Sequence, residues 1–359
     1  MNRKNICEIC TLIMGQSPDS KSYNKDKNGI PFYQGNADFG EEHPTPTVWC
    51  TAPKKIARKG DILISVRAPI GDMNIANEDC CIGRGLAAIR LNKSDIVDIN
   101  YLYHYLSATV EFLQEQGTGS TFKAINKTTL EGIEIPCPSI EKQKNIAKLI
   151  IEIKTSIQYK KAELFALNEL VKSRFIEMFG NPDANEKEWE KSKLENFINV
   201  VGGYAFKSQK YLSEGIPVLR IGNINAGYFK DTNLVFYQED SALEKYKIYP
   251  NDLVISLTGT AGKDDYGNIC LIDSTYDVYY LNQRNAKIEI KHTFNRFFLM
   301  HLFSHPEIKQ RLTGKNHGIR QGNILNKDIL ELDVYVPPIE LQNEFADFVK
   351  LIDKSKFVG

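Results

Sequence analysis

The sequence lacks long hydrophobic runs, low-complexity tracts and an excess of charge of either sign. No stretch approaches the roughly 18 consecutive apolar residues of a membrane-spanning helix, and the N-terminus does not resemble a signal peptide. The 359 residues carry 45 basic and 45 acidic side chains, which is not the basic excess typical of nucleic-acid-binding proteins, although a local basic face is still compatible with it. These absences predict a soluble, cytoplasmic protein with no membrane partner.

Cysteine is scarce and scattered. Of the 7 cysteines, only Cys7 and Cys10 form a Cys-x-x-Cys pair. There is no second pair and no pair of histidines at zinc-finger spacing, so reduced thiols are favoured over a zinc site.

Motifs for self-contained catalysis are also missing. Asn181-Pro182 is not followed by the Pro-Tyr or Pro-Phe of an adenine methyltransferase motif, and residues 259–263 are too short for a P-loop. Asp264-Asp265 could be half of a nuclease metal site, but no Glu-x-Lys follows it. We therefore expect no catalytic residue and no metal ligand in this chain.

The main feature that is present is an internal repeat. Its offset grows slowly, from 186 residues near the start to 199 residues near the end, so the two copies are collinear. A period this long indicates two copies of a whole domain rather than a solenoid of short units, and two related domains suggest two related sites. Residues 29–36 recur as 215–223, residues 60–65 as 251–256, and residues 138–143 as 337–342.

Each copy has the pattern of an α/β (α+β) domain. In the first copy, a turn precedes a β-rich run at residues 62–66, and apolar residues at helical spacing predict a helix over 99–115. A Gly-rich loop follows at 117–120. The second copy repeats this order with a strand at 251–257, a helix at 294–312 and a loop at 314–318.

The segment between the copies contains neither glycine nor proline from residue 139 to 179. Its apolar residues alternate steps of four and three, which is the period of a coiled-coil seam. At about 1.5 Å per residue, the predicted helix is about 60 Å long. Lys160 and Arg174 interrupt this seam, which we expect to bind a partner. Its apolar members are Ile146, Ile150, Ile153, Ile157, Leu164, Leu167, Val171 and Met178.

A second, shorter helix of about 20 residues follows Pro338. An antiparallel pairing with the central helix would bury parts of both seams, but the shorter helix can cover only about half of the longer one. Either residues 146–164 or residues 164–178 would then stay uncovered. We divide the chain into a first domain at 1–138, a helical spacer at 139–180, a second domain at 181–338 and a terminal helix at 339–359.

Several short motifs occur in the same order in both copies. Met14-Gly15-Gln16-Ser17-Pro18 in the first copy is matched by Gly203-Tyr204-Ala205-Phe206-Lys207 in the second. Gly-Ile-Pro runs follow, Pro-x-Ile-Glu-x-Gln opens each helix, and residues 174–182 form the linker. Over essentially the whole chain, this combination resembles the DNA specificity subunit of type I restriction-modification enzymes.

The resemblance implies two target-recognition domains, each reading one half of a split site in double-stranded DNA. It implies that the paired helices act as a spacer and bind methyltransferase (modification) subunits, and that this chain does no chemistry. The chain itself would hold no cofactor. S-adenosylmethionine would be on the methyltransferase subunit, and Mg and ATP for restriction on partner subunits that include the restriction/translocase subunit. The short terminal helix departs from the usual pattern, and self-association of this chain is a further expectation.

Candidate DNA-contacting residues follow from base chemistry. Arg fits guanine, Asn and Gln fit adenine, and cationic side chains anchor phosphates. Arg84 and Arg284, which we align with each other, and Lys123 and Arg320, after the Gly-rich loops, are the strongest. The whole set beside glycines or turns is Gln16, Gln34, Asn36, Arg67, Arg84 and Lys123 in the first copy, and Lys207, Arg220, Asn223, Lys263, Gln283, Arg284, Asn285, Arg320, Gln321 and Asn323 in the second.

Two other classes of function stay open. One is a structural protein that scaffolds a complex without reading DNA, and the other is a methyltransferase or nuclease that acts alone. Enrichment of particular sequences from random duplexes would exclude the first, and failure to bind S-adenosylmethionine or a metal would exclude the second.

Overall fold

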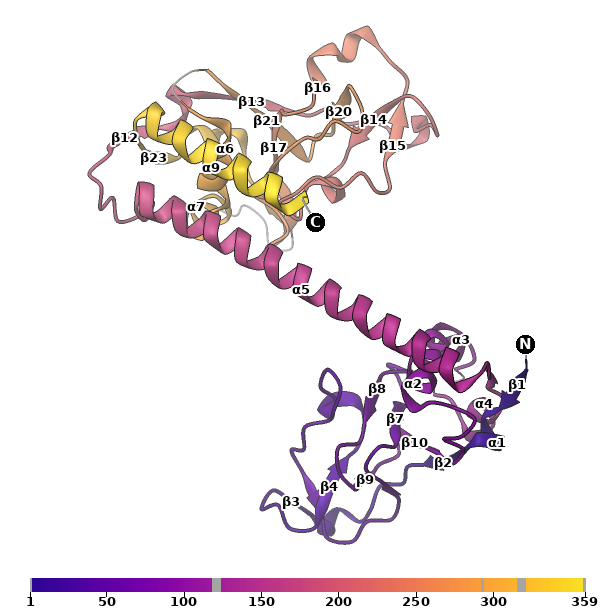
Figure 1. The fold of residues 1–359 in the computed structure, drawn as a ribbon. Helices are drawn as coiled ribbons and strands as arrows, with labels where there is room; N and C mark the ends of the chain where they lie inside the picture. Colours follow the sequence, from indigo (N-terminus) through magenta and orange to yellow (C-terminus); the bar gives the residue numbers. More distant parts are fainter. Residues whose placement is uncertain (1, 118–123, 292–293, 315–320, 358–359) are drawn as a thin grey trace. The chain divides into compact units, whose positions relative to one another are not determined.

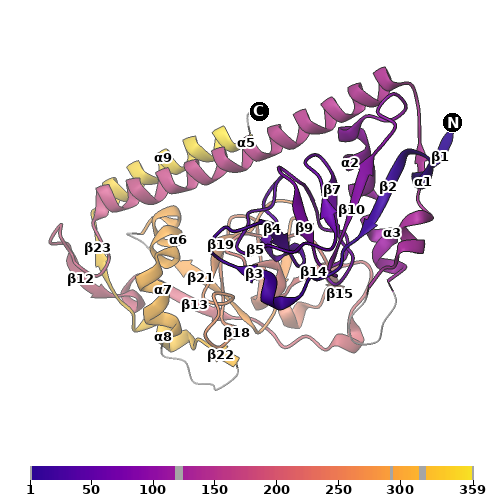
Figure 2. The same cartoon turned by 90° about the horizontal axis from the view of Figure 1, so that it is seen from below.

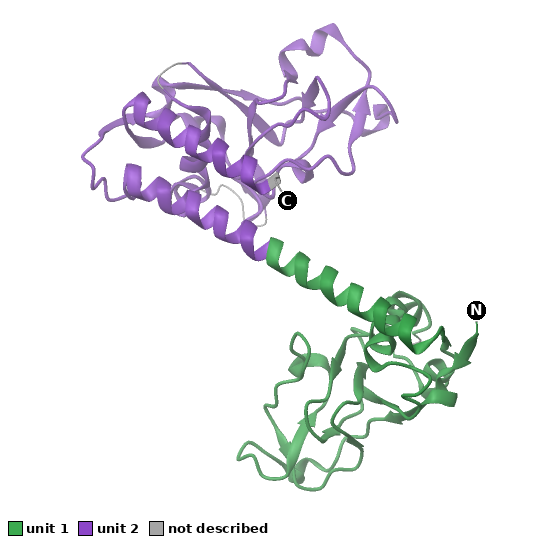
Figure 3. Ribbon diagram, viewed as in Figure 1, with its two compact units in different colours: residues 1–160 green, residues 161–359 purple. Residues whose placement is uncertain are grey.

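The computed structural model of the chain describes residues 2–117, 124–291, 294–314 and 321–357. The chain forms two compact units, Met1–Lys160 and Lys161–Gly359 (Figure 3). The division falls inside one helix, α5 (Ile140–Phe179), so each unit contains a part of it (Figure 1). In the described part of the chain, no helix is both long and apolar enough to cross a membrane.

Unit 1 is built on two sheets. The first is antiparallel, with four strands: β2 (Cys10–Met14), β10 (Leu86–Leu91), β7 (Ile62–Ser65) and β8 (Met73–Ile75), in that order. The second has five strands: β3 (Tyr23–Asn24), β5 (Trp49–Cys50), β4 (Ile30–Tyr33), β9 (Cys80–Ile82) and β6 (Ile56–Ala57). A separate pair consists of β1 (Arg3–Asn5) and β11 (Glu134–Pro136). The helices before α5 are α1 (Ile6–Ile9), α2 (Ile99–Ala108), α3 (Val110–Glu115) and α4 (Lys127–Glu131), with short 3₁₀ turns at Ser20–Ser22 and Asn36–Asp38.

Unit 2 repeats this arrangement. Its four-stranded antiparallel sheet contains β13 (Ile198–Gly202), β21 (Asn285–Ile290), β17 (Leu253–Ser256) and β19 (Ile269–Leu271), in that order. Its second sheet contains β15 (Val235–Tyr237), β14 (Ile216–Leu219), β20 (Tyr279–Leu281) and β16 (Lys247–Ile248). Two pairs are β12 (Glu190–Lys193) with β23 (Asp333–Val336), and β18 (Thr258–Thr260) with β22 (Gln321–Asn323). The helices are α6 (Arg296–Ser304), α7 (Pro306–Thr313), α8 (Asn326–Leu330) and α9 (Ile339–Phe357), with 3₁₀ segments at Leu194–Asn196, Ser208–Lys210, Ile221–Asn223 and Ser241–Tyr246.

The structural repeat confirms the sequence repeat and explains its apolar strands. In β7, Ile62 and Ile64 belong to the core against the helices, whereas Leu63 between them packs with residues of the second sheet. In β17, Leu253 and Ile255 likewise belong to the core against the helices, and Val254 between them packs with residues of the second sheet. Because successive strand residues point to opposite faces, a strand that is buried on both sides must be apolar throughout.

Each predicted helix after the strands proves to be two. The expected helix over 99–115 breaks at Thr109, whose hydroxyl donates to the carbonyl of Leu106 at 2.8 Å, so that α2 ends and α3 begins there. The expected helix over 294–312 breaks before Pro306, which starts α7. Proline lacks the N–H that would continue α6, but it suits the first position of a new helix.

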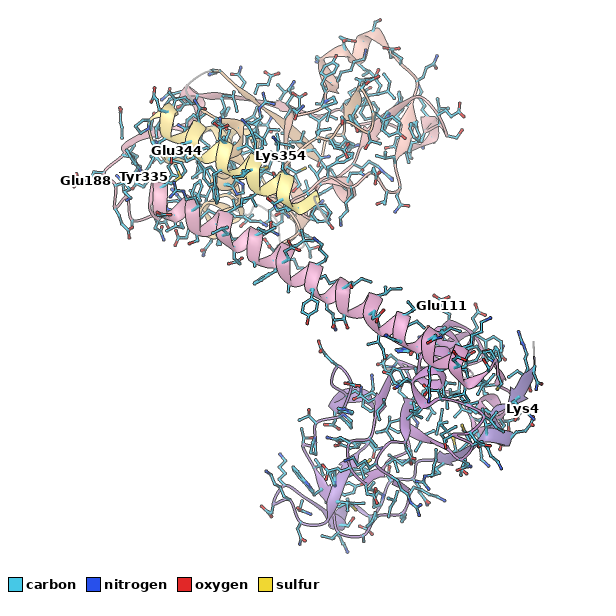
Figure 4. The ribbon with its side chains drawn as sticks, in the orientation of Figure 1. Lys4, Glu111, Glu188, Tyr335, Glu344 and Lys354 are labelled. Atoms are coloured by element: carbon cyan, nitrogen blue, oxygen red, sulfur yellow. The ribbon has the colours of Figure 1, made fainter. Side chains whose placement is uncertain are left out.

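The terminal helix pairs antiparallel with the C-terminal part of α5, as predicted. The rings of Phe179 and Phe345 lie 5.5 Å apart, while Asn168 and Lys356, further from this end, line one shared cavity. Figure 2 shows the two helices side by side, and Figure 4 labels Glu344 on α9, which accepts a hydrogen bond from Arg174 of α5 at 3.1 Å.

The predicted seam is therefore covered at one end. Val171 and Met178 of this seam are buried in unit 2. Because α9 has 19 residues and α5 has 40, α9 can cover only this end of the seam. In unit 1, Ile146 packs against the core beside Ala147. By contrast, Ile153 is 59% exposed and Ile157 is 49% exposed, so the uncovered part of the seam lies between Ile150 and Leu167.

Candidate nucleic-acid interface

Three loops of unit 1 meet at one end of the two sheets. They follow β2 (residues 15–17), follow β4 (34–35) and connect β9 to β10 (83–85). Main-chain hydrogen bonds join all three, so their backbone positions are mutually determined. The bonds run from Gly15 N to Leu86 O (2.9 Å), Gln16 N to Ile82 O (2.9 Å), Gly83 N to Tyr33 O (2.8 Å) and Gly85 N to Gln34 O (3.0 Å).

Two glycines allow this close approach. A Cβ on Gly15 would lie 2.1 Å from the carbonyl oxygen of Gly83. A Cβ on Gly83 would lie 2.9 Å from the Cα of Gln34. Because no side chain fits at either position, these glycines bring together the loops that carry the polar candidates.

The loops bring three predicted residues into neighbouring positions. Gln16, Gln34 and Arg84 are all exposed. The amide oxygen of Gln34 accepts a hydrogen bond from the Ser17 hydroxyl at 3.0 Å. Within the described residues, the Arg84 guanidinium and the Gln16 amide have no hydrogen-bond or ion-pair partner, so both side chains are available to a ligand.

The other candidates of unit 1 differ in their surroundings. Arg67 is exposed and follows Val66, whose N–H bonds the carbonyl of Gly85 at 2.9 Å, so it lies next to the same loops. Asn36 is half-buried and donates to Asp72 at 2.6 Å. Lys123 lies outside the described residues.

Unit 2 contains the same frame. Bonds at the equivalent positions join the loops after β13 and β14 to the loop between β20 and β21. Three of them run from Gly203 N to Asn285 O (3.1 Å), Tyr204 N to Leu281 O (2.8 Å) and Asn282 N to Leu219 O (3.2 Å). A fourth, from Leu257 N after β17 to Arg284 O (2.8 Å), is the counterpart of the bond from Val66 N to Gly85 O in unit 1.

In unit 2 these loops surround an open cavity of about 510 Å³. Four predicted residues line it: Arg220, Asn223, Gln283 and Arg284. The cavity therefore gathers side chains from loops that are 60 residues apart in the sequence, as a binding site requires.

The four residues do not have the same role. Asn223 is 3% exposed, and its amide donates to the carbonyls of Lys230 and Thr232 at 2.9 and 3.1 Å. Asn285 is fully buried and donates to the carbonyl of Leu219 at 2.9 Å. The amides of both asparagines are buried and hold the loops together, so neither is presented to a ligand as Gln283 and Arg284 are. That these two asparagines contact DNA stays a prediction.

Three cavity residues keep donors that a ligand can reach. Gln283 and Arg284 are exposed, and among the described residues their side chains have no hydrogen-bond or ion-pair partner. Arg220 is half-buried, and its guanidinium donates one hydrogen bond to the carbonyl of Asn233 at 2.5 Å.

The equivalent bonds also correct the alignment of the two arginines. Gly85 O and Arg284 O accept the same strand bond, from Val66 and Leu257 respectively. Arg84 therefore corresponds to Gln283, and Arg284 is one residue out of register. Aligning Arg84 with Arg284 requires an offset of 200 residues between the copies, whereas the equivalent hydrogen bonds give an offset of 199 residues here.

The remaining candidates of unit 2 lie on other elements. Lys207 is exposed and follows Phe206, which lines the cavity. Lys263 is exposed in the turn after β18, and Gln321 and Asn323 are on β22, which pairs with β18. These three form a second group of polar residues at the β18-β22 pair. Arg320 lies outside the described residues.

Some cavity residues were not predicted. Asn282 lines the cavity, and its side-chain oxygen accepts from the main-chain N–H of Arg284 at 3.3 Å. Its position in the polar run Asn282-Gln283-Arg284-Asn285, beside three predicted residues, is a sequence signal that could have identified it. Tyr211 also lines the cavity, and no local sequence feature distinguishes it from other tyrosines.

Comparison with known proteins agrees with the repeat. Residues 1–169 and 186–357 each match the family model described as the type I restriction modification DNA specificity domain. Because the two matches together cover most of the chain, they identify the family without reference to any single relative.

Individual relatives match parts of the chain. The putative type I restriction enzyme MjaX specificity subunit of Methanocaldococcus jannaschii is 49% identical over 152 residues, covering 42% of this chain and 36% of that protein. The MjaVIII specificity subunit of the same organism is 26% identical over 279 residues, covering 73% of this chain and 65% of that protein. The chain thus spans less than two thirds of the length of these relatives.

A solved structure has the same fold. The S subunit of a type I restriction-modification system from M. genitalium is 16% identical, with a TM-score of 0.60 over 99% of this chain and 90% of that one. Because two matches to one family model cover most of the chain, this chain belongs to the family of type I restriction modification DNA specificity domains.

Proposed function

We propose that this chain is the sequence-specific DNA-recognition subunit of a type I restriction-modification complex, and that each unit reads one half of a bipartite site. The observation that carries the proposal is the repeated loop frame. In both units it presents exposed glutamine or arginine side chains on a backbone held by four equivalent hydrogen bonds. A fixed backbone with free side chains is what base readout needs.

The side chains at these loops suit the edges of bases in the major groove. An arginine can bond the two acceptors of guanine, and a glutamine can bond the donor and acceptor of adenine. The loops of the two units carry different side chains, so we expect the two half-sites to differ. A net charge of zero is consistent with a modest contribution from sequence-independent phosphate binding.

The helices supply the second part of the proposal, the docking of methyltransferase subunits. On α5 the apolar side chains of Leu149, Ile153, Ile157 and Phe165 are between 49% and 68% exposed. Stripes of exposed apolar residues on a helix usually mark a protein interface. The methyltransferase subunits would bring S-adenosylmethionine and flip the target base from the duplex, and this chain would do no chemistry. Mg, ATP and the restriction subunit would join through the complex.

Selection from random DNA duplexes tests the proposal. The chain, coexpressed with its methyltransferase subunit, is expected to enrich two short specified sequences separated by an unspecified gap. Enrichment of nothing above the input pool, or of a single continuous sequence, would contradict it.

A further inference from the structure

One position of the loop frame carries different chemistry in the two units. The carbonyl of Gly83 accepts from Leu86 N at 3.0 Å, and the carbonyl of Asn282 accepts from Asn285 N at 2.9 Å. These bonds close the same tight turn before β10 and before β21. The two residues between the bonded ends are Arg84 and Gly85 in unit 1, and Gln283 and Arg284 in unit 2.

The neighbouring strands establish the same register independently. The parallel pairs β4-β9 and β14-β20 match Phe32 with Cys81 and Val218 with Tyr280. Counting from Cys81 and from Tyr280, the third residue is Arg84 in one unit and Gln283 in the other. Two sets of bonds thus place these two side chains at the same point of the fold.

Both side chains stand on a rigid backbone. Arg84 lies between Gly83 and Gly85, which are buried against Gln34 so closely that a Cβ on either would lie 2.5 Å from an atom of that residue. The N–H of Gln283 donates to the carbonyl of Tyr204 at 3.0 Å. Yet both side chains are exposed, and neither has a hydrogen-bond or ion-pair partner among the residues that the structure describes. The fold therefore fixes where each side chain starts and leaves its polar end free.

We propose that this position selects one base in each half-site, with Arg84 reading a guanine for unit 1 and Gln283 reading an adenine for unit 2. The inference rests on the proposed function and names two of its specificity-determining residues. A phosphate anchor gains most from a cation, and unit 2 has a neutral amide at this position, which favours base contact over phosphate contact. Both side chains, however, can make paired hydrogen bonds to a purine edge, and each has its own preferred purine.

Exchanging the two side chains tests the proposal. Arg84→Gln and Gln283→Arg are made separately in the chain coexpressed with its methyltransferase subunit, and each complex selects from random DNA duplexes. Arg84→Gln is expected to change one guanine to adenine in the half-site of unit 1, with a shift in preference of about ten-fold or more. Gln283→Arg is expected to produce the reverse change in the other half-site. All other selected positions stay as in the unchanged chain.

Arg84→Lys separates base readout from phosphate binding, because lysine keeps the charge but loses the two-pronged geometry. Base readout predicts that Arg84→Lys also weakens the preference for guanine. If Arg84→Gln weakens binding to all sequences alike while Arg84→Lys binds as tightly as the unchanged chain, Arg84 is a phosphate anchor. The inference is then wrong, while the proposed function stands. Unchanged base preferences in the two exchange variants also overturn the inference. If the unchanged chain selects no bipartite site, the proposed function itself fails. Melting temperatures show that each variant is folded.

Discussion

The side chain of Gln143, in the first turn of α5, accepts a hydrogen bond from the main-chain N–H of Asp98 at 2.9 Å. Asp98 is the residue that caps the start of α2. The amide of the same glutamine donates to the carbonyls of Ile96 and Pro138 at 2.8 Å. Unit 2 repeats this relationship, since Gln342 accepts from Asn295 N, at the start of α6, at 2.9 Å. The final glutamine of each Pro-x-Ile-Glu-x-Gln motif therefore ties a long helix to its own domain.

Removing this glutamine is expected to destabilise one unit. Gln342 is fully buried, so Gln342→Leu leaves the N–H of Asn295 and a carbonyl without their partner inside the protein. The loss should be roughly 1–3 kcal/mol in the free energy of unfolding, measured by urea denaturation. The exposed neighbour Asn343, which accepts a hydrogen bond from the Asn295 side chain at 2.8 Å, provides a control, because losing an exposed bond in Asn343→Ala should cost less. Equal stability of Gln342→Leu and the unchanged chain would contradict this role.

Arg284→Ala is expected to alter only the half-site read by unit 2. A lost base contact would relax the preference at one position by roughly 1–3 kcal/mol. A lost phosphate contact would instead weaken all sequences alike and lower the salt slope by about one unit. Selection from random duplexes at two salt concentrations distinguishes these outcomes. Because the Arg284 side chain is exposed, the melting temperature should not change; a large drop would assign it a structural role.

Arg67→Ala applies the same test to unit 1, at a different position of the fold. Arg67 is exposed beside the loops of that unit, so its loss should affect the first half-site and spare the second. An effect of either variant on both half-sites would argue against independent reading by the two units.

Lengthening α5 is expected to lengthen the gap between the half-sites. Four residues inserted after Ser156, where the helix is largely exposed, add about 6 Å of helix. Both specified sequences should be unchanged, and the number of unspecified base pairs between them should increase. Selection from random duplexes measures both. An unchanged gap would show that α5 does not set the spacing.

The uncovered seam of α5 is expected to make the chain self-associate when it is expressed without its methyltransferase subunit. Leu164 is 40% exposed and Phe165 is 68% exposed, so both offer apolar surface to a partner or a second copy. Leu164→Glu should reduce self-association and weaken binding of the methyltransferase subunit. Gln158→Glu adds the same charge at an exposed polar position of α5 and should change neither.

Sedimentation velocity of the isolated chain gives the outcome directly. A well-behaved monomer of 40.8 kDa, together with normal subunit binding by Leu164→Glu, would show that the seam is not an interface.

The pairing of α5, α6 and α9 is expected to weaken in acid. The ring of His301 on α6 lies 5.2 Å from the ring of Phe345. Burial lowers the pKa of His301 to about 4; the charge of Asp353 raises this pKa and the charge of Lys356 lowers it. The unfolded chain takes up the proton near the ordinary pKa of about 6.5, whereas the folded chain does not. Stability contributed here is fully present above about pH 6.5 and is lost as the pH falls toward about 4, up to about 3 kcal/mol.

His301→Phe removes the titrating group while keeping a ring at the same place. Its melting temperature should fall less than that of the unchanged chain between pH 7 and pH 4.5. The same slope in both proteins would show that His301 does not cause the acid sensitivity.

Much of the architecture follows from local sequence patterns. The repeat, the long helix between the copies and the shorter helix at the end could all be predicted, because helical periodicity and glycine-flanked turns depend on residues close together in the chain. The glycines near Gln16 and Arg84 indicated where polar side chains would be presented. The same reasoning assigned Asn223 and Asn285 to the interface, although an amide that bonds DNA and one that bonds a neighbouring loop look alike in sequence.

Two features were decided only by the tertiary structure. Loop packing against Gln34 and Tyr204 showed that Arg84 corresponds to Gln283 and not to Arg284. The antiparallel course of α9 decided that Val171 and Met178 are buried while Ile153 and Ile157 stay exposed. In each case the deciding contacts join residues far apart in the chain, and periodicity contains no information about which distant segments will meet.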